Sequence, residues 1–262
     1  MSISRRTFVA AGAAALLAAC TAGRKKAAAP RAPTTAAGST AAPPSTAPQA
    51  PPTTAAGPTG PARFVDAGPA TATTVALTFH GSGDPALTDQ LLAIAERLKA
   101  PITVFAVGQW LETNGSMAAK ILAAGHELAN HTYTHPALAT KARAVVATEI
   151  RQCRDVLTRQ TGSNGTWFRP SGIEGRPPAT VLEEAGAAGY PVVVGFDVDP
   201  LDYQDPGADA IVARTAAKLK GGSIVSLHLG HAGTVAAFER IVTGARAKHL
   251  EPVVVTALIG GH

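Results

Sequence analysis

The chain has 262 residues, of which 46% are hydrophobic and 16% are charged, and its formal net charge is +5 at pH 7. The excess positive charge lies at one end. Residues 1–62 carry six basic side chains and no acid, which leaves 17 basic and 18 acidic residues, a net charge of −1, in the remainder. Because a near-neutral domain offers no surface for phosphates, this composition argues against a nucleic-acid-binding protein.

Residues 1–20 have the pattern of an export signal. Arg5 and Arg6 precede a run of apolar and small residues, which indicates a twin-arginine signal peptide. The apolar run is shorter than the roughly 20 residues that span a bilayer. It ends in Leu-Ala-Ala-Cys, which resembles a bacterial lipobox, so we expect Cys20 to carry a lipid. The protein should then be anchored to the outer face of the cytoplasmic membrane, facing the cell wall.

Residues 21–62 consist almost wholly of Ala, Pro, Thr, Gly and Ser. Such a segment cannot bury enough apolar surface to offset the entropy of ordering it, so it is predicted to be a disordered linker. Residues 63–262 are long enough to form one domain with its own core. The only cysteine besides Cys20 is Cys153, so we expect no intramolecular disulfide and interpret Cys153 as a buried thiol.

The domain is predicted to alternate strands and helices. Short apolar runs predict seven strands, at 74–79, 102–107, 127–130, 166–169, 192–197, 223–228 and 252–257. Helical periodicity is clearest in 87–100 and 141–162, and Gly162 is expected to end the second of these helices. This alternation indicates an α/β fold with a parallel sheet, either open or closed into a barrel. The chain lacks the glycine-rich motifs that bind dinucleotides or nucleoside triphosphates.

Polar residues gather where the predicted strands end, at the edge of the sheet where parallel α/β proteins carry their functional side chains. These residues are His80, His131, Arg169, Asp197, Asp199 and His228. In the segment HTYTH, His131 and His135 are four residues apart. That spacing can direct two imidazoles at one metal ion if the segment turns like a helix.

Five segments resemble, in order, the motifs of the NodB-type polysaccharide deacetylases, carbohydrate esterase family 4. They are TFHGSGDP (78–85), HTYTH (131–135), RPSG (169–172), DPLDY (199–203) and LHL (227–229). The resemblance extends from about residue 64 to the C-terminus and implies a distorted (β/α)7 barrel. It also implies a hydrolase that removes acetyl groups from an N-acetylated polysaccharide, with peptidoglycan the first expectation. The alternative is an inactive module of the same fold that binds glycans in the cell wall. No protein partner is implied.

The resemblance assigns roles to individual residues. Histidines that match His131 and His135 bind a divalent metal, usually zinc, which polarises the acetyl carbonyl and activates a water molecule. The residue that matches His228 protonates the leaving amine, and the acid that matches Asp199 tunes it. The arginine that matches Arg169 pairs with the catalytic base. Two further residues, Tyr203 and Leu227, would line the pocket for the acetyl methyl group.

The first motif departs from the family pattern. The family has two adjacent carboxylates there, one acting as the base and the other as a metal ligand. This chain has His80 and Gly81 at those positions, and its next acid is Asp84. The changes leave three interpretations open, one of which is that activity has been lost.

In the first of the two active arrangements, Asp84 completes the metal site and His80 is the base, for which its reference pKa of about 6.5 is suitable. In the second, His80 completes a three-histidine zinc site and Asp84 is the base, paired with Arg169. The first is favoured because His80 occupies the position of the family's base.

Overall fold

The structure is a computed structural model that describes residues 60–260. The predicted signal peptide at 1–20, the lipidation site Cys20 and all but the end of the predicted linker at 21–62 lie outside the described residues. Within 60–260, no helix has both the length and the apolar character needed to cross a membrane. The first strand of the described fold begins at Arg63, and Ala62 before it is already buried.

Seven strands form the centre of the described domain. They are β1 (Arg63–Val65), β2 (Thr74–Gly81), β3 (Thr103–Ala106), β4 (Glu127–Asn130), β5 (Val192–Val194), β6 (Ile224–His228) and β7 (Glu251–Val253). Five of them form a sheet in the order β4-β3-β2-β6, with β7 also paired to β2, and β1 pairs with β5. Every ladder between these strands is parallel, as the alternating sequence pattern predicted.

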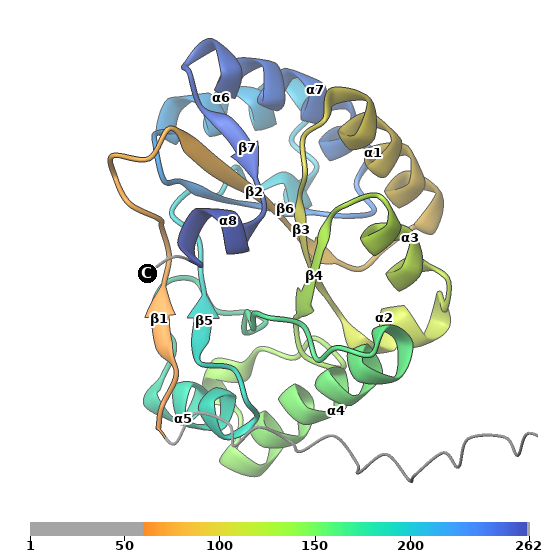
Figure 1. Cartoon of the computed structure of the whole chain (residues 1–262), viewed down its shortest axis with the longest axis vertical. Helices are drawn as coiled ribbons and strands as arrows, with labels where there is room; N and C mark the ends of the chain where they lie inside the picture. The colour runs from red at the N-terminus through yellow and green to blue at the C-terminus, as the bar shows by residue number, and fades with distance from the viewer. Residues whose placement is uncertain (1–59, 261–262) are drawn as a thin grey trace, which may run out of the picture. The chain divides into compact units, whose positions relative to one another are not determined.

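Single-residue bridges connect the two sheets. Phe168 bridges Asn130 of β4 to Val193 of β5, and Val198 bridges the segment after β5 to Val225 of β6. The strands therefore form a distorted barrel whose hydrogen-bond ladder is interrupted, surrounded by helices (Figure 1). The α/β fold expected from the sequence is confirmed.

The predicted and observed strands differ at four places, one of which is β5, which ends at Val194 where the prediction continued to residue 197. The predicted strand 166–169 is present only as the bridge at Phe168, and the short strand β1 was not predicted. The predicted strand 252–257 ends early, because α8 (Val255–Ile259) begins within it. Three consecutive valines favour a strand, but here the main-chain N–H of Val255 donates to the Thr103 hydroxyl instead of continuing the ladder.

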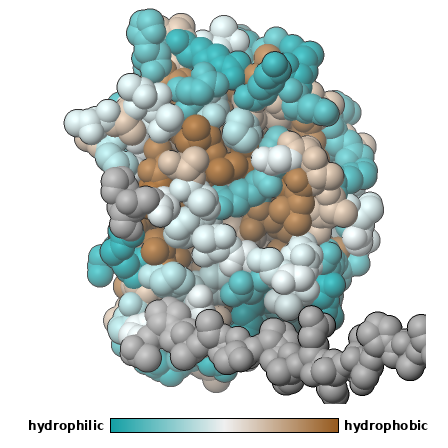
Figure 2. All heavy atoms as spheres, viewed as in Figure 1, coloured by the Kyte–Doolittle hydropathy of each residue, from teal (hydrophilic) through white to brown (hydrophobic). Residues whose placement is uncertain are grey.

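The outer layer consists of the remaining helices. They are α1 (Pro85–Leu98), α2 (Gly108–Thr113), α3 (Met117–Ala123), α4 (Arg143–Thr161), α5 (Ala179–Ala187), α6 (Ala208–Lys218) and α7 (Ala232–Ala247). Helices α1 and α6 pack against α7 on one side of the strands, and α2 and α5 pack against α4 on the other (Figure 1). Gly162 ends α4 at a φ of 75°, as predicted. Hydrophilic residues cover much of the outer helices, and hydrophobic atoms are visible between them near the centre of the view (Figure 2).

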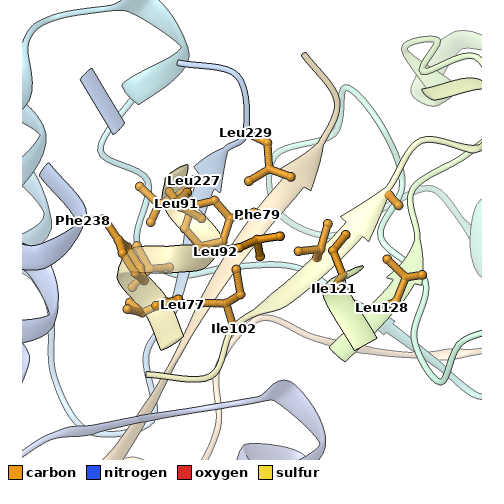
Figure 3. Packing of buried hydrophobic residues seen from close by; sticks show 14 of the residues in the cluster. Leu77, Phe79, Leu91, Leu92, Ile102, Ile121, Leu128, Leu227, Leu229 and Phe238 are labelled. Carbon is orange, nitrogen blue, oxygen red and sulfur yellow. The ribbon is translucent and has the colours of Figure 1, made fainter. Parts of the chain in front are cut away.

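Successive side chains of β2 point alternately into the hydrophobic core beneath the helices and into the interior of the barrel. Leu77 and Phe79 point outward to the helices, where the Phe79 ring packs edge-on against Phe238 of α7 at 5.7 Å (Figure 3). Residues at the intervening positions, including His80, point into the barrel. Cys153 of α4 is completely buried, and this burial raises the pKa of its thiol to about 12, which agrees with its interpretation as a structural thiol.

Candidate active site

His80 and His228 lie side by side at the carboxyl ends of β2 and β6. The two strands are parallel, and their register pairs His80 with His228. Paired residues on neighbouring strands project from the same face of a sheet. The two imidazole rings accordingly stack, with centroids 4.3 Å apart and planes inclined by 28°. The sheet thus brings together two histidines that lie far apart in the sequence.

His131 and His135 come from the loop that follows β4. The sequence allowed these two imidazoles to share a metal ion on condition that the segment turned like a helix, and the loop is not helical. Instead, Thr132 and His135 adopt positive φ values of 71° and 62°, conformations that are unfavourable for residues other than glycine. The side chain of Asn130 supports the turn by accepting a hydrogen bond from the main-chain N–H of Thr132 at 2.9 Å. As a result, the Nε2 atoms of His131 and His135 lie 3.1 Å apart.

The side chains of His80, His131 and His135 form a group that could hold a divalent metal. Each offers one nitrogen, and the three nitrogens lie within 4.8 Å of one another. Two ligands of a tetrahedral zinc ion with Zn–N bonds of about 2.1 Å would be about 3.4 Å apart, close to the separation of the two Nε2 atoms. His131 Nδ1 lies 2.8 Å from the main-chain oxygen of Arg169, so Nδ1 carries the proton and Nε2 is left to coordinate.

Burial keeps these imidazoles neutral. It is the main cause that lowers the pKa of His80 and that of His131 well below the ordinary value, and the charge of a neighbouring histidine is the next. The pKa of His135 is also lowered, by burial and then by His228. A neutral imidazole is the form that binds a metal ion, so both the geometry and the protonation state suit metal binding.

Asp84 does not join the three histidines. It is the N-cap of α1, where its exposed carboxylate accepts a hydrogen bond from the main-chain N–H of Ala86 at 2.8 Å. Gly83, with a φ of 99°, turns the chain directly into this helix, and the free N–H groups of the first turn attract the carboxylate. The ligand set of Asp84, His131 and His135 is therefore not assembled, and His80 takes the third place in the group.

The carboxylate beside His228 is that of Asp202, whereas Asp199 was expected there. Asp202 is completely buried, and its Oδ1 lies 2.7 Å from His228 Nδ1. Its Oδ2 accepts hydrogen bonds from the His228 main-chain N–H at 2.8 Å and the Thr234 hydroxyl at 2.6 Å. Leu201, at a φ of 55°, reverses the chain so that the second acid of DPLDY, not the first, meets β6. Asp202 was not among the site residues expected from the sequence.

Asp199 lies instead in the wall of the cavity. Its Oδ1 accepts a hydrogen bond from the main-chain N–H of Leu201 at 2.7 Å. Burial raises its pKa, an effect opposed by this hydrogen bond and by the attraction of His228. Asp199 therefore contacts the same cavity as His228 without being its hydrogen-bond partner.

Arg169 has no carboxylate partner within residues 60–260, although the resemblance implied that it pairs with the base. Its guanidinium donates to the Thr78 hydroxyl at 2.8 Å and to the main-chain oxygens of Val194 and Gly195 at 3.1 and 2.8 Å. Burial lowers its pKa to about 9. Because a histidine stands where the family has the carboxylate, Arg169 here ties β2 to the end of β5.

Leu227 does not line the pocket. Neighbouring residues on a strand point to opposite faces, so Leu227 points away from the side occupied by His228. It is completely buried in the core beside Phe79 and Leu91 (Figure 3). The preceding residue, Ser226, faces the cavity and was not selected from the sequence. Its hydroxyl lies 3.0 Å from His80 Nε2 and orients that ring.

A cavity of about 470 Å³ opens over these residues. His80, His135 and His228 contribute to its wall, as do the apolar side chains of Ile173 and Phe196 and the two acids Asp199 and Glu174. Tyr203, which the sequence analysis had placed here, lies at the edge of the cavity with its ring 5.1 Å from that of His228. The cavity is thus lined both by histidines of the possible metal site and by His228, which is paired with Asp202.

Known proteins share this sequence and fold. Residues 67–193 match the family model described as polysaccharide deacetylase. A chitooligosaccharide deacetylase of Sinorhizobium fredii is 32% identical over 161 residues, which are 61% of this chain and 73% of that protein. A peptidoglycan-N-acetylglucosamine deacetylase of Bacillus cereus is 29% identical over 195 residues, 73% of this chain and 90% of that protein.

The structure is also similar to the crystal structure of the Bc1960 peptidoglycan N-acetylglucosamine deacetylase. The TM-score is 0.71 and the sequence identity 25%, and the match covers 76% of this chain and 94% of the other. Together, the matching motifs, the fold and these relatives show that this chain belongs to the polysaccharide deacetylase family, a family of hydrolases that act on carbon–nitrogen bonds other than peptide bonds.

Proposed function

We propose that the protein removes acetyl groups from an N-acetylated polysaccharide, using a divalent metal bound by His80, His131 and His135. The observation that carries this proposal is the arrangement around the cavity: three neutral nitrogen ligands lie beside a histidine that is paired with a buried carboxylate. The bound metal, which we expect to be zinc, would polarise the acetyl carbonyl and lower the pKa of its water from 15.7 to about 7.

The neutral charge of the three proposed ligands affects whether the reaction needs a separate base to deprotonate the water. Neutral imidazoles leave the charge of the ion undiminished, whereas a carboxylate ligand would offset part of it. Within residues 60–260, no carboxylate joins the three histidines, and the carboxylate of Asp84 is engaged at the N-terminus of α1. We therefore propose that the reaction in this chain does not use a carboxylate base in the first motif, and that the proton of the activated water would pass to the solvent, because its pKa would be about 7 with the metal bound.

His228 is proposed to be the general acid. Asp202 accepts a hydrogen bond from Nδ1 of the ring, which leaves Nε2 to carry the proton that the leaving amine receives. The buried carboxylate also holds the ring in this orientation, as the acid of a catalytic triad does for its histidine. The ring of His80 stacks on that of His228, which places the acid next to the proposed metal site.

Peptidoglycan is the proposed substrate. The peptidoglycan deacetylase of B. cereus resembles this chain over most of its own length, and the predicted export would bring the domain to the cell wall. The apolar side chains of Ile173, Phe196 and Tyr203 in the cavity wall suit an acetyl methyl group and the face of a sugar ring. Chitooligosaccharides, the substrates named for other relatives, are the comparison to make.

Acetate release tests this function. The purified protein would be stripped of metal with a chelator and then assayed on peptidoglycan fragments and N-acetylglucosamine oligomers, with and without added zinc or cobalt. We expect acetate release only when a metal is restored. If the protein binds these glycans but releases no acetate under any metal condition, it is instead the inactive glycan-binding module.

We further propose that Cys20 anchors the protein to the membrane through a lipid, as the lipobox-like sequence indicates. Replacing Cys20 by Ala should move the protein from the membrane fraction to a soluble or uncleaved form, which immunoblotting of cell fractions would detect. Replacing Arg5 and Arg6 by Lys should block export in the same assay. If the Cys20→Ala protein stays entirely with the membrane at the mature size, the lipid anchor does not exist.

A further inference from the structure

The loop that carries His131 and His135 does not owe its shape to local sequence preferences. Two of its residues, Thr132 and His135, have positive φ, and Thr132 is β-branched, so the conformation is unfavourable in isolation. Such conformations persist only where the surrounding structure holds them. The contacts that hold this loop therefore decide where the two imidazoles lie.

Glu149 of α4 provides three of these contacts, all of them at the middle of the loop. Its Oε2 accepts hydrogen bonds from the main-chain N–H groups of Tyr133 at 2.9 Å and Thr134 at 2.8 Å. Its Oε1 accepts a third from the Thr134 hydroxyl at 2.6 Å. All three donors belong to the two residues immediately before His135. One carboxylate thus fixes the middle of the segment that separates His131 from His135.

Within residues 60–260, hydrogen bonds from the loop satisfy the carboxylate of Glu149, and no ion pair does. The side chain is buried, with 7% of its surface exposed, and no Lys, Arg or His within 60–260 forms an ion pair with it. A buried carboxylate is costly unless hydrogen bonds satisfy it. The folded loop supplies those hydrogen bonds, so the loop and the carboxylate stabilise each other.

We infer that Glu149 is a positioning residue for the metal site: it holds Tyr133 and Thr134 so that the Nε2 atoms of His131 and His135 point to one ion. This inference rests on the proposed function, in which these histidines bind the metal. Glu149 itself would not touch the metal or the substrate. Replacing its carboxylate by an amide removes one acceptor oxygen and places an NH2 group against the loop donors.

Glu184 of α5 offers a matched control. It is also a buried glutamate, 8% exposed, but its carboxylate accepts hydrogen bonds from Arg143 and Arg151 and not from the loop. Glu149→Gln and Glu184→Gln would each remove one buried carboxylate. Both variants should lower the melting temperature, because each loses a buried carboxylate. Only Glu149→Gln should also disturb the geometry of the metal site.

The experiment compares zinc affinity by equilibrium dialysis and the visible spectrum of the cobalt-loaded full-length protein. We expect Glu149→Gln to weaken zinc binding on the order of 10- to 100-fold, the usual effect of removing a group that orients a ligand, and to alter the cobalt bands. Glu184→Gln should retain the parent's affinity and spectrum. If Glu149→Gln fails to fold, Glu149→Asp replaces it, with weaker zinc binding again expected because its carboxylate is one methylene short of the loop.

The outcomes separate this inference from the proposed function. Parent-like zinc affinity and an unchanged cobalt spectrum in the folded Glu149 variant would overturn the positioning role while leaving the metal-dependent function intact. Equal weakening in the Glu149 and Glu184 variants would likewise overturn it, since the effect would then be one of stability. Failure of the parent protein to bind zinc or cobalt would overturn the proposed function itself.

Discussion

Replacing His80 by Ala should abolish most of the zinc binding, whereas replacing Asp84 by Asn should leave it intact. His80 belongs to the group of three nitrogens, so its loss leaves two ligands, and we expect zinc affinity to fall on the order of 100-fold or more. Asp84 caps α1. Because Asn is about as good an N-cap as Asp, Asp84→Asn should also keep the fold. Metal analysis after dialysis against dilute zinc would measure both effects.

An exposed histidine provides the control for this comparison. His249, which follows the end of α7, lies outside the group of ligands and adopts a positive φ that Asn tolerates. His249→Asn should bind zinc like the parent. Loss of zinc in Asp84→Asn but not in His80→Ala would reinstate the arrangement in which Asp84 is the ligand. If neither variant changes zinc content, the proposed three-histidine site is wrong.

Replacing His228 by Ala should reduce acetate release on the order of 10²–10⁴-fold while zinc content stays near that of the parent. The reason is that His228 is proposed to donate a proton from Nε2 and is not one of the three grouped ligands. Rates would be measured on N-acetylglucosamine oligomers alongside the metal content of each preparation. Loss of zinc together with activity would make His228 a ligand instead of the acid.

The same assay distinguishes the two acids of DPLDY. Asp202→Asn should reduce the rate strongly, because it removes the charge beside His228 Nδ1 and replaces one carboxylate oxygen by an NH2 group. Asp199→Asn should have a much smaller effect, since its carboxylate accepts from Leu201 and does not bond to His228. A larger loss in the Asp199 variant would restore the role that the sequence had suggested for that residue.

The family and the fold class could be predicted from the sequence because they depend on local patterns. Alternation of apolar strands with amphipathic helices indicates a parallel α/β fold, since strand and helix periods are properties of short segments. The ends of the predicted strands carry His80, His131 and His228. The carboxyl ends of parallel strands lie at the same edge of a sheet, so residues at those ends lie close together. Identifying the strands was therefore enough to predict that these residues meet. Gly162 was identified as a helix end for a similar local reason.

Partners within the site could not be predicted, because hydrogen-bond pairing depends on loop conformations that the motifs do not encode. The positive φ of Leu201 decides that Asp202 and not Asp199 meets His228. The helix beginning at Pro85 draws the carboxylate of Asp84 away from the histidines. In each case, the three-dimensional structure decides which hydrogen-bond donor the carboxylate reaches. The residue types alone do not show which acid pairs with His228 or whether Asp84 joins the histidines.

The sequence by itself thus determined the strand–helix alternation, the family and the histidines that gather at the strand ends, because each of these follows from a short periodic or ordered pattern. Only the tertiary structure decided that His80 joins the group of ligands, that Leu227 packs in the core and that Glu149 supports the loop from a distant helix. These outcomes depend on strand register and on contacts between segments far apart in the chain, whose energies no local pattern contains.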